Sequence, residues 1–173
     1  MEAIQSRVLK LKTKYKGFSP EEVCQALGIT VLYKPMGNFK GACKGFFINL
    51  NRMSYITVNS DLPENYQRII ISHELGHAVL HRKEQSVRAF HDISLFDDGS
   101  KLEYEANIFA AEFLLDDKEI FSVLNEDLTF FAAASVLNVP VELLDFKWRA
   151  MKKRGYKIVD TPVMAKGNFL KDI

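Results

Sequence analysis

The stretch His73-Glu74-Leu75-Gly76-His77 decides how the rest of the chain can be interpreted. In a helix, residues four positions apart lie on one face, about 6 Å apart along the axis. His73 and His77 can therefore turn a ring nitrogen toward the same cation, and Glu74 lies beside it. The spacing H-E-x-x-H thus predicts two metal ligands and a general base for a water molecule. The alternative interpretation is a helix that carries two solvated histidines.

A third ligand is expected on a later helix, because a catalytic zinc ion takes three protein ligands and keeps one position open. Ser100 to Glu103 forms a capping box, which gives Glu103 a structural role at the start of that helix. Glu105 has no such role and borders the apolar face of the helix, where a carboxylate needs a partner. The predicted Zn²⁺ ligands are His73, His77 and Glu105, and the predicted catalytic residue is Glu74.

Other polar side chains near these stretches are weaker candidates. Glu112 lies about 10 Å beyond Glu105 along the same helix, so it cannot bind the same ion. We expect its side chain either to be solvated or to contact one of the metal ligands without binding the metal itself. His81 continues the series of histidines but lies about 9 Å past the expected ion, which argues against a ligand role. His91 is expected in a long loop, either at the surface or near substrate or metal. Candidates for stabilising an oxyanion are Tyr66, His91 and Tyr104.

Composition sets the broad class. The chain has 173 residues, of which 47% are hydrophobic, so we expect one domain over residues 1–173 with a sizeable core. A net charge of +1 gives no general attraction to nucleic acid or to an anionic membrane. The start of the chain lacks a signal peptide and no apolar run could span a membrane, which predicts a cytoplasmic protein without a membrane partner. Cys24 and Cys43 match no zinc spacing and are expected to be reduced thiols.

Patterns along the chain predict an α+β fold, with a small three-stranded sheet and a mostly helical C-terminal part. Apolar residues at helical spacing, with Ser19-Pro20 as one capping signal, indicate the helices. Runs of β-branched and aromatic residues indicate the strands, and Asn49 to Arg52 suits a hairpin turn. Helices are expected at 1–16, 19–28, 61–81, 100–115, 128–137 and 140–153, strands at 29–33, 43–50 and 55–58, and a long loop at 83–99.

Residues 126–157 have the outline of a helix-turn-helix, with a break at Asn138-Val139. The second helix of this pair carries a basic cluster that could hold phosphates. We favour the interpretation of a helical hairpin with a solvated basic face, because Trp148 is expected to be buried and few groups suit base reading. DNA binding is therefore a conceivable activity but not an expected one. The basic cluster consists of Lys147, Arg149, Lys152, Lys153, Arg154 and Lys157.

Two stretches resemble the ImmA/IrrE family of bacterial and phage metallopeptidases. One is His73-Glu74-Leu75-Gly76-His77-Ala78-Val79-Leu80-His81, and the other runs from Glu105 to Leu115 and is similar to the family pattern E-A-N-x-F-A-A-x-L-L. A looser resemblance extends from Phe18 to Leu144. Asp116-Asp117 stand where the family often has Met-Pro, a difference that concerns local packing or substrate preference.

The resemblance implies a zincin-like fold, with zinc bound by both histidines and by the Glu that precedes A-N, which is Glu105 here. It also implies that Glu74 is the catalytic base. By the same likeness, the target would be a helix-turn-helix transcriptional repressor of a phage, a mobile element or a stress regulon.

Together these observations predict a zinc-dependent metallo-endopeptidase that cleaves a protein substrate. The alternative is a non-proteolytic metal-binding regulatory protein that binds a repressor or DNA. Glu74 argues against this alternative, because a structural metal site needs no general base. Strands 43–50 and 55–58 come just before the histidine helix, so we expect the substrate to bind in extended form along the edge of the sheet. The sequence sets no oligomeric state.

Overall fold

The computed structural model describes residues 2–81, 101–124, 128–158 and 162, which form seven helices and three strands. The fold is α+β, as the sequence predicts. The helices are α1 (Glu2–Lys14), α2 (Pro20–Ala26), α3 (Glu64–Leu80), α5 (Lys101–Leu114), α6 (Asp117–Leu124), α7 (Phe130–Val136) and α8 (Val141–Lys153), and the strands are β1 (Ile29–Lys34), β2 (Gly45–Leu50) and β3 (Met53–Asn59).

Short-range signals in the sequence set several of these boundaries. Ser19 caps α2 through a complete capping box with Glu22, and Pro20 occupies the first turn. The β2–β3 hairpin turns at Asn51 and Arg52, which both have positive φ angles of 51° and 68°. Two successive positive φ angles are typical of the tight hairpin turn whose twist matches the strands it joins. The expected turn is thus confirmed at its last two residues.

The sheet has the order β1-β3-β2, with β1 parallel to β3 and β2 antiparallel to it. Strand β2 therefore lies at an edge of this sheet. The N–H of Phe47 points away from β3, because it donates a hydrogen bond to the carboxylate of Glu74 on α3. Backbone groups in an antiparallel ladder alternate with a period of two, so those of Gly45 and Asn49 face the same outer side.

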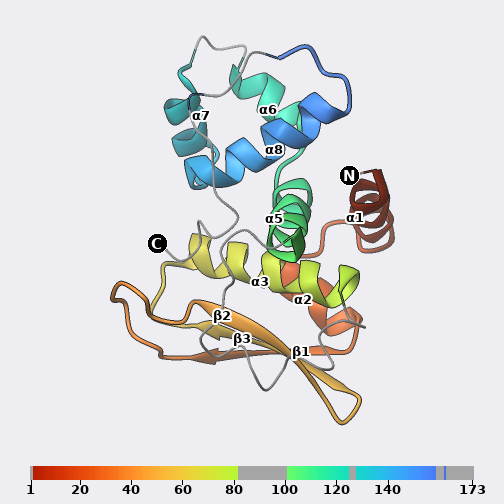
Figure 1. Ribbon diagram of the computed structural model, residues 1–173, viewed down its shortest axis with the longest axis vertical. Coiled ribbons are helices and arrows are strands. Elements are labelled where there is room, and N and C mark those ends of the chain that lie inside the picture. Colours follow the sequence, from red (N-terminus) through yellow and green to blue (C-terminus); the bar gives the residue numbers. More distant parts are fainter. Residues whose placement is uncertain (1, 82–100, 125–127, 159–161, 163–173) are drawn as a thin grey trace.

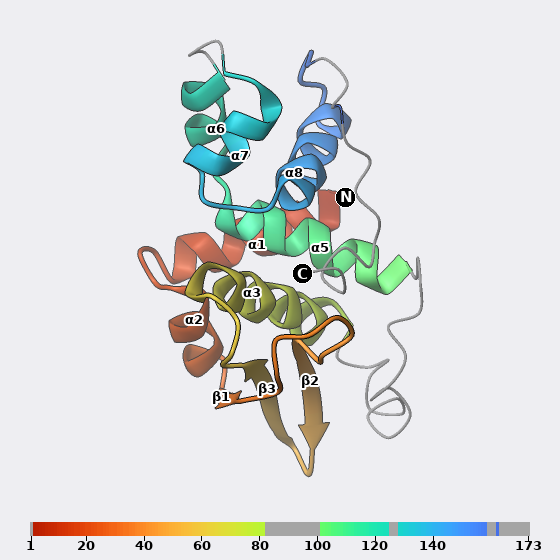
Figure 2. The same cartoon turned by 90° about the vertical axis from the view of Figure 1, so that its left-hand side faces the viewer.

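The elements form layers that begin at the sheet. Helices α2 and α3 cover one face of the sheet, and α1 and α5 lie on the far side of α3 (Figures 1 and 2). Helices α6, α7 and α8 gather beyond α5, at the end of the molecule opposite the sheet. Helix α5 is thus enclosed by α1, α3 and α8, and it is the element through which the helical C-terminal part meets the histidine helix. No described helix combines the length and the apolar composition needed to cross a lipid bilayer.

Three of the six basic residues predicted to form a solvated face are paired with carboxylates instead, and for these three the prediction is wrong. Lys147 is 2% exposed, with its Nζ atom 2.8 Å from Glu112 Oε2 and 2.7 Å from Asp117 Oδ1. Arg154 also pairs with both of these carboxylates. Arg149 pairs with the buried Asp145 at 2.6 Å. Half of the predicted basic cluster is therefore neutralised by carboxylates, whereas Lys152, Lys153 and Lys157 are exposed.

Two further expectations for this region are confirmed. Trp148 is buried and stacks edge-on against Phe130 of α7. The break between α7 and α8 includes Asn138, whose positive φ of 52° ends the first helix of the pair. The sequence interpretation of Glu112 as solvated or as a support for a ligand is corrected, since its carboxylate is buried between Lys147 and Arg154.

Candidate metal centre

Helix α3 holds the predicted motif inside the protein. His73, Glu74 and His77 are all buried, as are the residues from Ile69 to Ala78 around them. A helix that is buried on every side lies between layers of a core, which shields its polar groups from bulk water. The motif is therefore placed where a charged or metal-binding group must find its partners within the protein.

The start of α5 provides the partners of the buried motif, because it packs closely against the second half of α3. Gly76 makes this approach possible, because a Cβ atom there would lie 3.1 Å from two side-chain atoms of Phe109 and 3.2 Å from the Cα atom of Ala106. The two carboxylate oxygens of Glu103 then reach the histidines. Glu103 Oε2 lies 3.2 Å from His73 Nε2, and Glu103 Oε1 lies 3.2 Å from His77 Nε2.

The structure differs from the sequence-based expectation at the third ligand position. Glu105 does not face the two Nε2 atoms; its Oε2 atom lies 3.0 Å from His81 Nε2. The expectation rested on Glu105 bordering the one apolar face of the helix. Helix α5 is in fact buried on all sides from Ala106 to Phe113, so its apolar face does not identify the side that meets α3. We therefore replace Glu105 by Glu103 in the candidate ligand set.

The donor atoms of His73, His77 and Glu103 fit a small divalent cation. The two Nε2 atoms are 3.1 Å apart, and the ligand atoms of all three residues lie within 4.8 Å of one another. Tetrahedral zinc with bonds of about 2.0–2.2 Å places neighbouring ligand atoms about 3.3–3.6 Å apart, slightly more than the observed spacings. Two imidazole lone pairs at this distance repel each other unless a proton or a cation lies between them.

The outer ring nitrogens of both histidines are also occupied. His73 Nδ1 lies 2.8 Å from Asn107 Oδ1, and His77 Nδ1 lies 3.2 Å from His81 Nδ1. Asn107 follows Glu103 by four positions, so the two side chains lie on the same face of α5. The spacing Glu-x-x-x-Asn was the signal in the sequence that could have identified Glu103, because it pairs a carboxylate with a group that orients a histidine.

Electrostatics favour positive charge between these groups. Burial alone would lower the pKa of His73, but hydrogen bonding to Glu103 and the charges of Glu103 and Glu74 outweigh it, so this pKa is raised. Burial would raise the pKa of Glu103, yet the hydrogen bonds from His73 and His77 hold it well below its usual range. A bound cation would supply the positive charge that this arrangement favours.

Glu74 lies beside the cluster without joining it. Burial raises the pKa of its carboxyl group above the ordinary value, against the opposing effects of His73, His77 and the N–H of Phe47. A raised pKa brings a carboxylate closer to the range in which it can take and return a proton near neutral pH. The N–H of Phe47 fixes one side of this carboxylate from strand β2.

Of the weaker candidates, His91 lies outside the described residues, as does Ser100 of the expected capping box. The ring of Tyr104 packs edge-on against Phe146 of α8, at 5.7 Å between centroids. Tyr66 is partly buried against the core. These contacts give neither tyrosine a link to the cluster of His73, His77 and Glu103.

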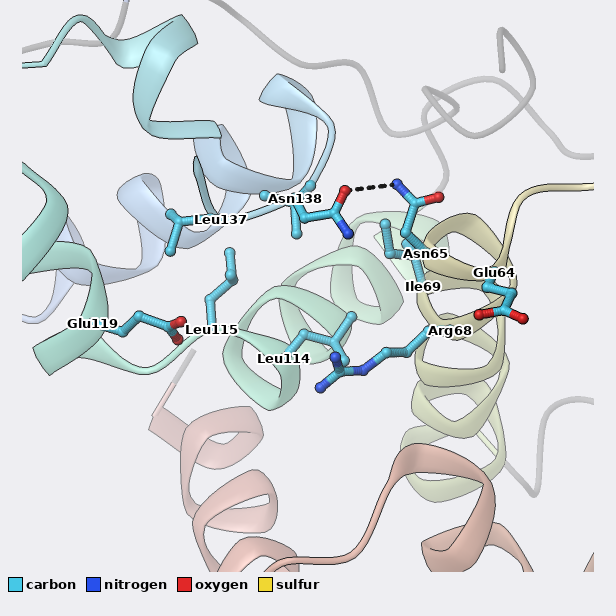
Figure 3. Close-up of a pocket in the computed structure, with 10 residues that line it drawn as sticks. Glu64, Asn65, Arg68, Ile69, Leu114, Leu115, Glu119, Leu137 and Asn138 are labelled. Carbon is cyan, nitrogen blue, oxygen red and sulfur yellow. Dashed lines mark hydrogen bonds between the residues drawn. The ribbon is translucent and has the colours of Figure 1, made fainter. Parts of the chain in front are cut away.

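A separate pocket of about 460 Å³ lies at the other end of the α3–α5 pair (Figure 3). Ile69, Leu114 and Leu115 form part of its apolar lining, and Asn65 contacts Asn138 across it at 3.4 Å. The pocket lies near the start of α3 and the end of α5. It therefore belongs to the junction with the C-terminal helices and not to the metal centre.

Comparisons with known proteins give one family and two relatives to which the chain is similar. The model of the peptidase M78 family, which describes an IrrE N-terminal-like domain, matches residues 24–149. The chain is 34% identical over 144 residues to the uncharacterized immunity region protein 2 of Bacillus phage phi105. The aligned residues make up 83% of this chain and 88% of that protein. It is 30% identical over 132 residues to metallopeptidase ImmA of Bacillus subtilis (strain 168), and the aligned residues make up 73% of this chain and 72% of that protein.

Proposed function

The chain belongs to the peptidase M78 family with its IrrE N-terminal-like domain, and from this premise we propose that it is a zinc-dependent metallo-endopeptidase. The observation that carries the proposal is the buried group of His73, His77 and Glu103 with Glu74 next to it. Family membership supports the class of reaction. The donor set supports zinc, which favours imidazole and carboxylate ligands in a tetrahedral arrangement.

His73 and His77 would hold the zinc ion through their Nε2 atoms and Glu103 through its carboxylate. When bound, zinc would act as a Lewis acid toward the scissile carbonyl and would make a water molecule more acidic. The proton transfers are carried out by residues of the chain. Glu74 takes a proton from the attacking water and returns it to the leaving amine, while the N–H of Phe47 holds the Glu74 carboxylate in one orientation.

The substrate is an extended peptide segment that binds along β2. The outward N–H and C=O groups of Gly45 and Asn49 can pair with a peptide main chain, in the manner of an added strand. Such recognition depends mainly on the backbone, so the cleaved segment must be able to leave its own fold. We propose a flexible linker of a helix-turn-helix repressor as the target. The likeness to a phage immunity region protein supports this choice.

The test is incubation of the zinc-loaded protein with the repressor encoded beside its gene, followed by intact mass measurement. We expect two fragments that sum to the repressor plus one water. Glu74→Gln keeps the shape of the side chain and lacks the base, so it should bind zinc as the parent does and produce no fragments. Full cleavage by this variant would refute the mechanism. Normal regulatory activity of Glu74→Gln in cells would favour a protein that acts by binding its target.

A further inference from the structure

The carboxylate of Glu105, which is not among the candidate ligands, connects to the metal centre through a second buried side chain. Its Oε2 atom lies 3.0 Å from His81 Nε2, and His81 Nδ1 lies 3.2 Å from His77 Nδ1. His81 is 4% exposed. The three residues thus form a continuous chain of contacts that ends on the outer nitrogen of a candidate ligand.

The positions of the protons in this chain follow from the chemistry of its members. An ionised carboxylate only accepts hydrogen bonds, so the Nε2 atom of His81 carries a proton. In a neutral imidazole the other nitrogen then bears a lone pair, so Nδ1 of His81 accepts. The proton between the two rings consequently belongs to Nδ1 of His77. With a cation bound, this leaves the Nε2 atom of His77 with its lone pair directed at the ion, in place of the proton that it otherwise donates to Glu103.

His73 is oriented in the same way by a simpler device. Its Nδ1 atom lies 2.8 Å from the amide oxygen of Asn107, which accepts its proton and leaves Nε2 with a lone pair. Both histidines therefore present the same tautomer to the ion, one by means of an amide and the other by means of an imidazole and a carboxylate. Partners of this kind orient metal-binding histidines in many sites.

We propose that His81 and Glu105 are positioning residues that fix the tautomer and orientation of His77 for metal binding, without being ligands. This inference rests on the zinc site of the proposed function. The series of contacts from Glu105 through His81 to His77 also links two helices. His81 follows the last residue of α3, where its backbone N–H donates to the carbonyl oxygen of His77 at 2.9 Å, and Glu105 lies near the start of α5. Loss of either member should therefore leave His77 in place but free to present the wrong tautomer.

The test uses zinc and Co²⁺ as probes, so it does not depend on any substrate. His81→Phe removes both ring nitrogens, and Glu105→Leu removes the acceptor with little change in volume. Glu105→Gln keeps an acceptor oxygen and serves as the conservative variant. Lys101→Ala is the matched control, since Lys101 lies 3.7 Å from Glu105 but is 85% exposed. Zinc affinity is measured by competition with a chromogenic chelator, and thermal melting of the metal-free proteins checks their fold.

We expect His81→Phe and Glu105→Leu each to weaken zinc binding by about 10–100-fold and to change the visible spectrum of the Co²⁺ form. Glu105→Gln and Lys101→Ala should stay close to the parent protein. Because both residues act through one chain, the double variant should be no weaker than His81→Phe alone. Glu103→Gln, a change to a candidate ligand, should weaken binding more than any of these.

Two results would overturn the inference while leaving the zinc site intact. One is parental zinc affinity in His81→Phe or Glu105→Leu when Glu103→Gln has lost zinc. The other is a double variant whose loss equals the product of the two single losses. By contrast, a parent protein that binds no zinc would refute the proposed function itself, and this inference with it.

Discussion

Replacement of the buried Lys147 by Met should strongly destabilise the protein. The Nζ atom of Lys147 lies 2.8 Å from Glu112 and 2.7 Å from Asp117, and the Lys147 and Glu112 side chains are 2% and 7% exposed. Removing one partner of a buried ion pair costs about 3–5 kcal/mol, because the remaining charge stays buried. Arg154 still contacts both carboxylates, so we take the lower end, about 3 kcal/mol.

Urea unfolding of the metal-free protein measures this loss. For a chain of this size, about 3 kcal/mol corresponds to a fall of about 6–12 °C in melting temperature. Removing both charges together, in Lys147→Met with Glu112→Leu, should restore stability to within about 1 kcal/mol of the parent. In that double variant Asp117 keeps Arg154, whose Nη2 atom is 2.7 Å from each of its carboxylate oxygens.

Lys153→Met is the control for this experiment, since it changes an exposed lysine of the same helix. A surface change of this kind should alter stability by less than about 0.5 kcal/mol. The reasoning fails if Lys147→Met loses less than about 1 kcal/mol. It also fails if adding Glu112→Leu restores nothing, because the unpaired Glu112 carboxylate would then not be the source of the loss.

Three further predictions concern the substrate edge, acid stability and DNA. Asn49→Pro removes an outward N–H of β2 and should slow cleavage while zinc content stays constant; an unchanged rate, with Asn49→Ala as control, would exclude strand addition. Burial would raise the pKa of Asp117, but Lys147 and Arg154 outweigh it and hold this pKa below its usual value, so its stabilising effect is present above about pH 4 and is lost as pH falls through the lowered pKa of the folded state. The difference in unfolding free energy between the parent and Asp117→Asn should therefore shrink as pH falls below that value. Duplex DNA should not bind with sub-micromolar affinity at physiological salt, and binding abolished by reversing Lys152 and Lys153 would contradict this.

Local patterns in the sequence were sufficient for most of the fold. The Ser19-Pro20 cap, the β-branched strands and the turn at Asn51-Arg52 each depend on residues a few positions apart, and the structure contains all of them. The motif from His73 to His77 likewise needs only helical periodicity. These features could be read without knowledge of which elements pack together.

The rotation of α5 and the state of its charges could not be predicted in this way. Choosing between Glu103 and Glu105 requires knowing which side of α5 meets α3, and a helix enclosed on every side gives no such signal. The six basic residues of the C-terminal cluster appear solvated in the sequence because the acids that neutralise Lys147 are 30 or more positions away. Both errors arise from contacts between distant segments, to which periodicity is insensitive.

In the proposed function, strand β2 would connect recognition of a substrate with its cleavage. The N–H of Phe47 is already bonded to the carboxylate of Glu74. A bound peptide would therefore pair with the outward backbone groups of Gly45 and Asn49, which lie on either side of Phe47 and each about 7 Å from it along the strand. A peptide shifted by one residue would lose both pairings at once. The cut site would then be set by the register in which the main chain of the target pairs with β2, and would depend little on the side chains of the target.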